Sequence, residues 1–243
     1  MRDFVGKRYW LVGATEGLGL ALARKLNAAG ASVILSGRDE GRLAEAVASL
    51  PIHARGVRCD VADRDSVKAA AEEVGEIDGL VFLAGVYWPM KAQAWNAEQV
   101  EAMLDVNLIG AARVLGEVLP AMVARDRGHV VLTGSLSGFR GLPGAIGYAP
   151  SKAGVMSLAE SMYADLRGTG VEVQLANPGF IRTRLTAKND FRMPFIMEPE
   201  EAARDMFEHM CGDTFQRSFP TLFALFFRLA RFLPDGIYYR IFG

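Results

Sequence analysis

Short apolar runs alternate with longer segments of helical periodicity over most of the chain. The apolar runs are brief and bounded by Gly, Asp or Asn, as buried strands are. Repeated strand–helix–strand order requires a parallel sheet with helices on both faces, which predicts a doubly wound Rossmann-type α/β fold. The predicted strands are residues 9–12, 33–35, 80–83, 130–132 and 171–175, and the predicted helices are residues 18–29, 42–50, 66–74, 100–125 and 151–167.

Length and composition narrow the function classes. The 243 residues suit a single α/β domain, and the formal net charge of -1 gives no reason to expect a nucleic-acid partner. Cys59 and Cys211 are too few for a disulfide framework or a metal site, so we expect free thiols in the cytoplasm and no bound metal. Because no window offers 18 uncharged apolar residues, no transmembrane helix is predicted.

A glycine-rich turn lies at the first strand–helix junction, with Gly13, Gly17 and Gly19 between the strand and the helix. Residues without a Cβ let the backbone approach a pyrophosphate, and a helix N-terminus offers unpaired N–H groups and partial positive charge. The alternative is a turn that only packs helix against strand. Because the turn opens a βαβ unit, we predict that it binds a dinucleotide.

Tyr148 and Lys152 form a Tyr-x-x-x-Lys pattern at the start of a predicted helix. Residues four apart share a helix face, so the ammonium would lie near the phenol. A phenol with an ordinary pKa near 10 is a poor acid–base catalyst at neutral pH, and a nearby cation would favour its ionised form. The pattern therefore predicts that Tyr148 transfers a proton.

The glycine spacing, the Tyr-x-x-x-Lys pattern, the segment Thr133–Gly138 and the Asn-Pro-Gly at 177–179 together resemble the short-chain dehydrogenase/reductase family, from the first strand to about Thr183. The resemblance implies an oxidoreductase that moves a hydride between a nicotinamide and a carbonyl or secondary alcohol. It implies that Ser135 holds the substrate oxygen, with Ser137 as the near competitor, and that Asn107 positions a water for a proton relay. The alternative for Asn107 is a helix-kinking or surface residue.

The cofactor choice depends on the residue after the second strand. Arg38 stands where NAD-preferring sites carry an acid, and a guanidinium can pair with a 2′-phosphate, so we predict NADP(H) rather than NAD(H). A solvated loop arginine beside Asp39 is the alternative. By resemblance, the predicted cofactor-binding residues are Gly13, Thr15, Glu16, Gly17, Leu18, Gly19, Arg38, Asp60, Val61, Ala84, Gly85, Tyr148, Lys152, Pro178, Gly179, Ile181 and Thr183.

Three positions depart from the family pattern, since Val12 replaces a Thr and Phe82-Leu83 replace two Asn. We expect apolar packing to substitute for polar bracing there. Residues 1–183 are predicted to form the cofactor and catalytic core, and residues 184–243 a substrate lid and C-terminal helices. Aromatic and methionine side chains on loops favour either a bulky apolar substrate or a self-packed lid: Trp88, Trp95, Phe139, Phe180, Phe191, Met193, Phe195 and Met197.

The segment 219–233 is predicted to be a basic, aromatic-rich helix with one stripe of Thr221, Ala224, Arg228 and Arg231. Such a helix either makes a weak contact with a membrane surface or seals the active site or a subunit interface. By resemblance, the helices 100–125 and 151–167 would pair subunits in a homodimer or homotetramer. The competing functions are a non-catalytic NADP-sensing protein and a membrane-surface-binding protein of the same fold.

Overall fold

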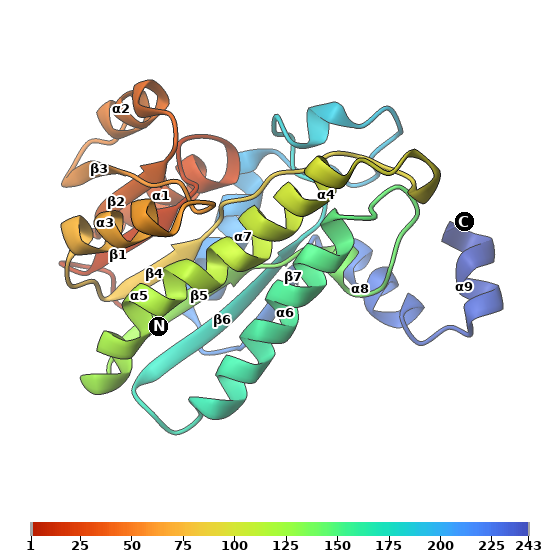
Figure 1. Cartoon of the computed structure of the whole chain (residues 1–243). Helices are drawn as coiled ribbons and strands as arrows, with labels where there is room; N and C mark the ends of the chain where they lie inside the picture. The colour runs from red at the N-terminus through yellow and green to blue at the C-terminus, as the bar shows by residue number, and fades with distance from the viewer. Residues whose placement is uncertain (1, 243) are drawn as a thin grey trace.

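The computed structural model describes residues 2–242 and contains a seven-stranded sheet in which all neighbouring strands are parallel (Figure 1). The strand order β3-β2-β1-β4-β5-β6-β7 switches direction between β1 and β4, where such sheets bind ligands beyond their carboxyl ends. The strands are β1 (Arg8–Val12), β2 (Ser32–Gly37), β3 (Ala54–Arg58), β4 (Gly79–Phe82), β5 (Gly128–Thr133), β6 (Val171–Pro178) and β7 (Gln216–Phe219).

Helices cover both faces of the sheet, which confirms the predicted doubly wound fold. Helices α3, α5 and α6 contribute buried side chains to one core cluster, and α1, α2 and α7 contribute to the other. The helices are α1 (Gly17–Ala28), α2 (Glu40–Ala48), α3 (Arg64–Val74), α4 (Ala97–Leu104), α5 (Gly110–Ala124), α6 (Tyr148–Asp165), α7 (Pro199–Cys211), α8 (Thr221–Ala230) and α9 (Asp235–Phe242).

The central strands supply side chains alternately to the two clusters. Trp10 and Val12 point into the first cluster, whereas Tyr9 and Leu11 point into the second, as the two-residue period of a strand requires. Phe82 also belongs to the first cluster and is 1% exposed. Apolar packing therefore occupies the positions of Val12 and Phe82, where the family pattern has polar residues.

Two edge strands and several boundaries differ from the sequence prediction; for example, α6 begins at Tyr148 instead of residue 151. β3 and β7 were not assigned ranges, because ARGVR and QRSF carry few apolar residues and each strand has one neighbour. The helix predicted over 219–233 was wrong at its start, since Phe219 ends β7 and α8 begins after Pro220. β7 pairs with β6 and α7 packs on α1, so residues after 183 also build the sheet and the core.

Helices α4 and α5 are joined by a π-helical turn, Asp105–Ile109, into one continuous helix, Ala97–Ala124. By length and composition alone this helix could cross a membrane, with a mean hydropathy of 1.5 over 18 residues. Its buried side chains, among them Met103, Val114 and Val118, pack in the protein interior. The long helix predicted from the sequence is therefore present, and its π turn carries Asn107.

A buried polar chain joins β1, β5 and β6 on the face covered by α7. The Tyr9 hydroxyl lies 2.9 Å from His129 Nδ1, and His129 Nε2 lies 2.8 Å from Gln174 Oε1. The Gln174 amide donates to three backbone carbonyls in the segment 209–214. Gln174 Oε1 must then accept from His129 Nε2, which leaves Nδ1 to accept from Tyr9. Burial lowers the pKa of His129 to about 3.

Replacement of His129 by Gln should reduce the loss of stability in acid. The folded protein keeps His129 neutral, whereas the unfolded chain takes up a proton below its ordinary pKa of 6.5, so stability falls as pH drops from 6.5 towards 3. Between about pH 7 and pH 4.5 this residue should remove about 2–3 kcal/mol. Urea unfolding at both pH values should show a loss smaller by that amount in His129→Gln.

The exposed His53 provides the control, because His53→Asn should leave the acid-dependent loss unchanged. An equal loss in wild type and His129→Gln would show that His129 does not remain neutral in the folded protein.

Candidate active site

One large pocket of about 870 Å³ lies at the carboxyl ends of β1, β4, β5 and β6. The glycine turn, Arg38, Ser135, Tyr148 and Lys152 all line it. Every predicted site residue lines this pocket except Asn107, which lies behind its wall. The cofactor-binding roles of these residues remain predictions.

The turn after β1 combines packing demands with an open helix terminus. Gly13 has φ +87°, and a Cβ there would lie 2.5 Å from the Ala84 backbone. A Cβ on Gly19 would lie 2.5 Å from the Gly13 carbonyl. Packing therefore requires glycine at both positions, whether or not a cofactor binds. Helix α1 begins beside the pocket at Gly17, with no side chain capping its first N–H groups. That terminus fits a pyrophosphate, because its N–H groups and helix dipole attract anions.

Tyr148, Ser135 and Lys152 converge because β5 ends beside the start of α6. Ser135 follows β5, and Tyr148 is the first residue of α6. Lys152 lies one turn later, where its Nζ donates to the Thr133 carbonyl at 2.9 Å and lies 5.8 Å from the centre of the Tyr148 ring. Ser137 Oγ donates to Ser135 Oγ at 2.9 Å, so the competitor predicted from the sequence supports Ser135.

The electrostatics differ from the sequence expectation that a cation favours the phenolate. The Tyr148 ring is partly exposed on the pocket wall, but burial of its hydroxyl end raises the pKa to about 12, against a hydrogen bond with Ser135 that lowers it. Burial also lowers the pKa of Lys152 to about 8. Desolvation outweighs attraction because the ammonium points to the Thr133 carbonyl, so at neutral pH the phenol keeps its proton.

Asn107 is fully buried in the π turn, so the surface alternative is wrong. Its Oδ1 accepts from the Val86 N–H at 2.8 Å, and its Nδ2 donates to the Val86 carbonyl and to Ser151 Oγ. These bonds connect the loop after β4 to α6 behind the pocket wall. A water-positioning role for Asn107 remains a prediction.

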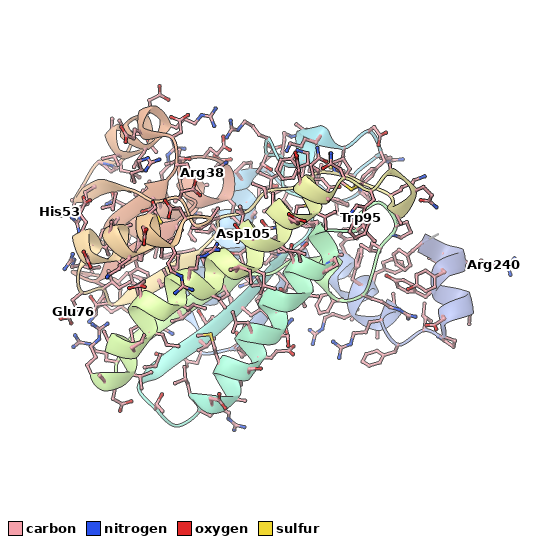
Figure 2. The ribbon with its side chains drawn as sticks, in the orientation of Figure 1. Arg38, His53, Glu76, Trp95, Asp105 and Arg240 are labelled. Atoms are coloured by element: carbon pink, nitrogen blue, oxygen red, sulfur yellow. The ribbon has the colours of Figure 1, made fainter. Side chains whose placement is uncertain are left out.

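The end of the pocket near β2 is rich in arginine. Arg38 follows β2 at the pocket edge (Figure 2) and has no ion-pair partner among residues 2–242. Asp39 caps α2 and pairs with Arg42 at 3.6 Å, and Glu16 pairs with Arg184. Both nearby acids are thus neutralised by arginines that the sequence analysis did not assign to the site.

On the opposite side of the pocket, the loop after β4 is hydrogen-bonded to the segment after β6. The Tyr87 hydroxyl donates to Asn189 Oδ1 at 2.8 Å, and Lys188 Nζ donates to the Tyr87 carbonyl at 2.7 Å. The Tyr87 ring lies edge-on to Tyr148, with 4.9 Å between ring centres. The segment after β6 is therefore tied to a residue that packs on the predicted proton donor. No sequence motif marks Tyr87, which lies in a loop.

Few of the aromatic and methionine residues predicted for the substrate end line the pocket. Phe180 and Phe191 do, and the sequence analysis missed Phe223 and Phe227, which α8 adds beside them. Trp95 was wrongly placed, since it is 57% exposed on the segment before α4 (Figure 2). Five further predicted residues do not line the pocket: Trp88, Phe139, Met193, Phe195 and Met197. Trp88 contacts Lys188, Phe139 packs on the first core cluster, and Met197 is buried.

Among residues 2–242, no three His, Cys, Asp or Glu side chains are grouped closely enough to hold a metal ion. Cys59 is buried and Cys211 is partly buried, and both are free thiols. The pocket's chemistry therefore rests on hydroxyl, ammonium and guanidinium groups.

Residues 7–192 match the short chain dehydrogenase family, and the chain belongs to it. An uncharacterized oxidoreductase of Myxococcus xanthus is 38% identical, over 94% of this chain and 93% of its own. A short chain dehydrogenase/reductase from Burkholderia phymatum, solved in complex with NAD, has a TM-score of 0.84 and 27% identity over 95% and 94% of the two chains. Actinorhodin polyketide ketoreductase, solved with NADPH, has a TM-score of 0.80 and 26% identity over 90% and 97%.

This dehydrogenase/reductase is an oxidoreductase with a nucleotide-binding Rossmann fold. The two solved relatives carry different cofactors, so the family alone leaves the choice between NAD and NADP open. The choice between NAD and NADP must therefore depend on the side chains beside β2.

Replacement of Lys152 by Met should stabilise the protein at neutral pH. The ammonium is charged in both states at pH 7, and the folded state bears the desolvation that lowers its pKa from 10.5 to about 8, equivalent to about 3 kcal/mol. As pH rises from 8 to 10.5, the folded protein loses this proton first, so wild type gains stability and the advantage of Lys152→Met shrinks. Urea unfolding at pH values across this range measures the difference in free energy of unfolding between wild type and Lys152→Met.

The exposed Lys68 on α3 is the control, because Lys68→Met should give no pH-dependent gain. If Lys152→Met were destabilised equally at all pH values, packing and not the buried charge would dominate at this position.

Proposed function

We propose that this short chain dehydrogenase/reductase uses NADPH to reduce the carbonyl group of a bulky, apolar substrate to an alcohol. One observation carries the proposal: a single pocket has an arginine- and glycine-lined end, a phenylalanine-lined end, and Tyr148 on the wall with Ser135 and Lys152. A cofactor and an apolar substrate could therefore meet at the phenol.

The roles of the catalytic residues follow from their protonation states. NADPH would supply the hydride to the carbonyl carbon. Tyr148 would donate its proton to the carbonyl oxygen, and with a pKa of about 12 the phenol carries that proton at neutral pH. Ser135 would orient the oxygen by a hydrogen bond, and the Lys152 ammonium would stabilise the phenolate left behind.

The cofactor contacts follow the shape of the pocket. The N-terminus of α1 would bind the pyrophosphate, and Asp60 and Val61 would lie near the adenine. By resemblance to the family, Ala84, Gly85, Pro178, Gly179, Ile181 and Thr183 would contact the nicotinamide half, and all six line the same pocket as Tyr148. Arg38 would pair with the 2′-phosphate, since it has no ion-pair partner among residues 2–242 and the nearby acids Glu16 and Asp39 already pair with Arg184 and Arg42.

We also propose a homodimer or homotetramer in the cytoplasm. Helices α5 and α6 leave Val123 and Tyr163 exposed, and a symmetric contact could cover such residues. Free thiols are compatible with a reducing compartment. Sedimentation of the purified chain tests the assembly.

Tyr148→Phe should abolish turnover while leaving NADPH binding intact. Loss of the general acid should lower kcat by about 100-fold or more, because phenylalanine has no proton to donate to the carbonyl oxygen. Turnover is measured as NADPH oxidation with aldehydes and ketones of increasing chain length, and binding as quenching of protein fluorescence. Tyr163→Phe, on the surface, is the matched control. NADPH oxidation by Tyr148→Phe at the wild-type rate would remove the proposed role.

Arg38→Gln should weaken NADPH binding by about 10- to 100-fold, the value of one charge-assisted hydrogen bond to a phosphate, and leave NADH binding unchanged. The ratio of the two dissociation constants is the measurement. Arg58→Gln is the control, since Arg58 pairs with Glu40 outside the pocket lining. Equal weakening of NADH and NADPH would contradict a 2′-phosphate contact.

A further inference from the structure

The last two helices expose an unusual amount of apolar surface. Of the sixteen large apolar side chains exposed in residues 2–242, eight lie after residue 220. Apolar surface concentrated in this way marks an interaction site more often than chance exposure does. The eight residues are Leu222, Leu225, Phe226, Leu229, Phe232, Ile237, Tyr239 and Ile241.

Helix α8 is apolar on both of its faces. Phe223 and Phe227 line the pocket, while Leu222 is 77% and Leu229 61% exposed on the side away from it. The stripe of Thr221, Ala224, Arg228 and Arg231 predicted from the sequence is not one continuous exposed surface, because Ala224 is buried. Because apolar side chains on two sides of α8 cannot all be covered by the monomer, the exposed side is a candidate surface for a partner.

The charges around this face are positive. Arg228, Arg231 and Arg240 are exposed, and none has an acidic side chain within 4.0 Å in the described part of the chain. Figure 2 shows Arg240 projecting from α9 away from the sheet. The one acid of α8 and α9, Asp235, pairs with Arg140. Unpaired arginines beside apolar side chains complement anionic lipid headgroups.

The loop before α6 holds this unit in a fixed orientation. Arg140 donates to the carbonyls of Arg231 and Leu233, and its guanidinium lies 4.0 Å from the centre of the Tyr238 ring. The Tyr238 hydroxyl donates to the Gly141 carbonyl at 3.0 Å. The loop before α6 therefore fixes the exposed surface next to the pocket, although α9 stands apart from the layered core (Figure 1).

We propose that the face formed by the eight exposed side chains and the three arginines docks on an anionic phospholipid bilayer. Helix α8 has ten residues, too few to span the hydrocarbon core, so it would lie in the plane of the interface. A second copy fits less well, because a two-fold contact would bring the arginines of the two copies together.

Docking also suggests a source for the substrate. One helix thickness separates the exposed face from Phe223 and Phe227 in the pocket, so a lipid-soluble carbonyl compound could enter from the bilayer beside α8. This second step rests on the proposed reductase function, whereas docking itself does not.

Flotation of the full chain, saturated with NADPH, tests docking with vesicles of phosphatidylcholine alone or mixed with phosphatidylglycerol. Wild type should float with the anionic vesicles and remain behind with the neutral ones. Leu225→Ser/Leu229→Ser and Arg228→Glu/Arg231→Glu should each lower the partition coefficient by about tenfold or more. Val5→Ser and Lys68→Glu, exposed on other surfaces, should bind as wild type does.

Absence of wild type from the anionic vesicles would overturn docking, as would equal binding to neutral vesicles. A dimer that dissociates in Leu225→Ser/Leu229→Ser, without vesicle binding, would assign the face to a second copy instead. Reduction of a short soluble ketone should be unchanged in both double variants, while reduction of a long-chain ketone held in anionic vesicles should fall about tenfold with binding. If the wild-type protein oxidised no NADPH with any ketone tested, the reductase proposal would be contradicted and docking would be unaffected.

Discussion

The hydrogen bond from the Lys152 ammonium to the Thr133 carbonyl ties the start of α6 to the end of β5. It holds a charged group in a buried position, where desolvation opposes the charge. Tyr148 precedes Lys152 by one helical turn, and Ser135 follows Thr133 by two residues, so the junction of β5 and α6 that this contact marks places both hydroxyls on one wall. The rest of the pocket is arranged around this wall by the parallel sheet, whose strands end at the same edge.

Desolvation also decides which proton the site can give. The hydroxyl end of Tyr148 is buried and the nearby Lys152 ammonium points to the Thr133 carbonyl, so the cofactor-free protein holds the Tyr148 proton at neutral pH. The hydrogen bond from Tyr87 to Asn189 lies at the pocket beside the same ring. A proton held on the phenol is compatible with the proposed reduction, in which Tyr148 would act as the acid.

The central strands and the glycine turn could be predicted because they carry strong local signals. β1, β4 and β5 each contain an unbroken run of three or more apolar residues, and Gly13 occupies a backbone conformation that other residues avoid. The edge strands β3 and β7 lack this signal, since polar residues are tolerated where one side of a strand faces solvent. Their pairing depends on neighbours distant in the sequence.

The candidate site could be predicted where a motif fixed the spacing, as with Ser135, Tyr148 and Lys152. Contacts between loops could not, because Tyr87 and Asn189 are about a hundred positions apart and belong to no motif. The direction in which the pKa of Tyr148 shifts could not be predicted from the sequence either, because it depends on where the Lys152 ammonium points. Likewise, the apolar run at the C-terminus revealed a helix but not which of its faces would meet solvent.

A crystal structure of the chain with NADPH tests the central claim most directly. The account predicts the pyrophosphate at the N-terminus of α1, the 2′-phosphate beside Arg38, and the nicotinamide against the wall that carries Tyr148, with its reactive carbon and the phenol facing one shared space. A dinucleotide bound elsewhere, or a phenol turned away from the nicotinamide, would contradict it.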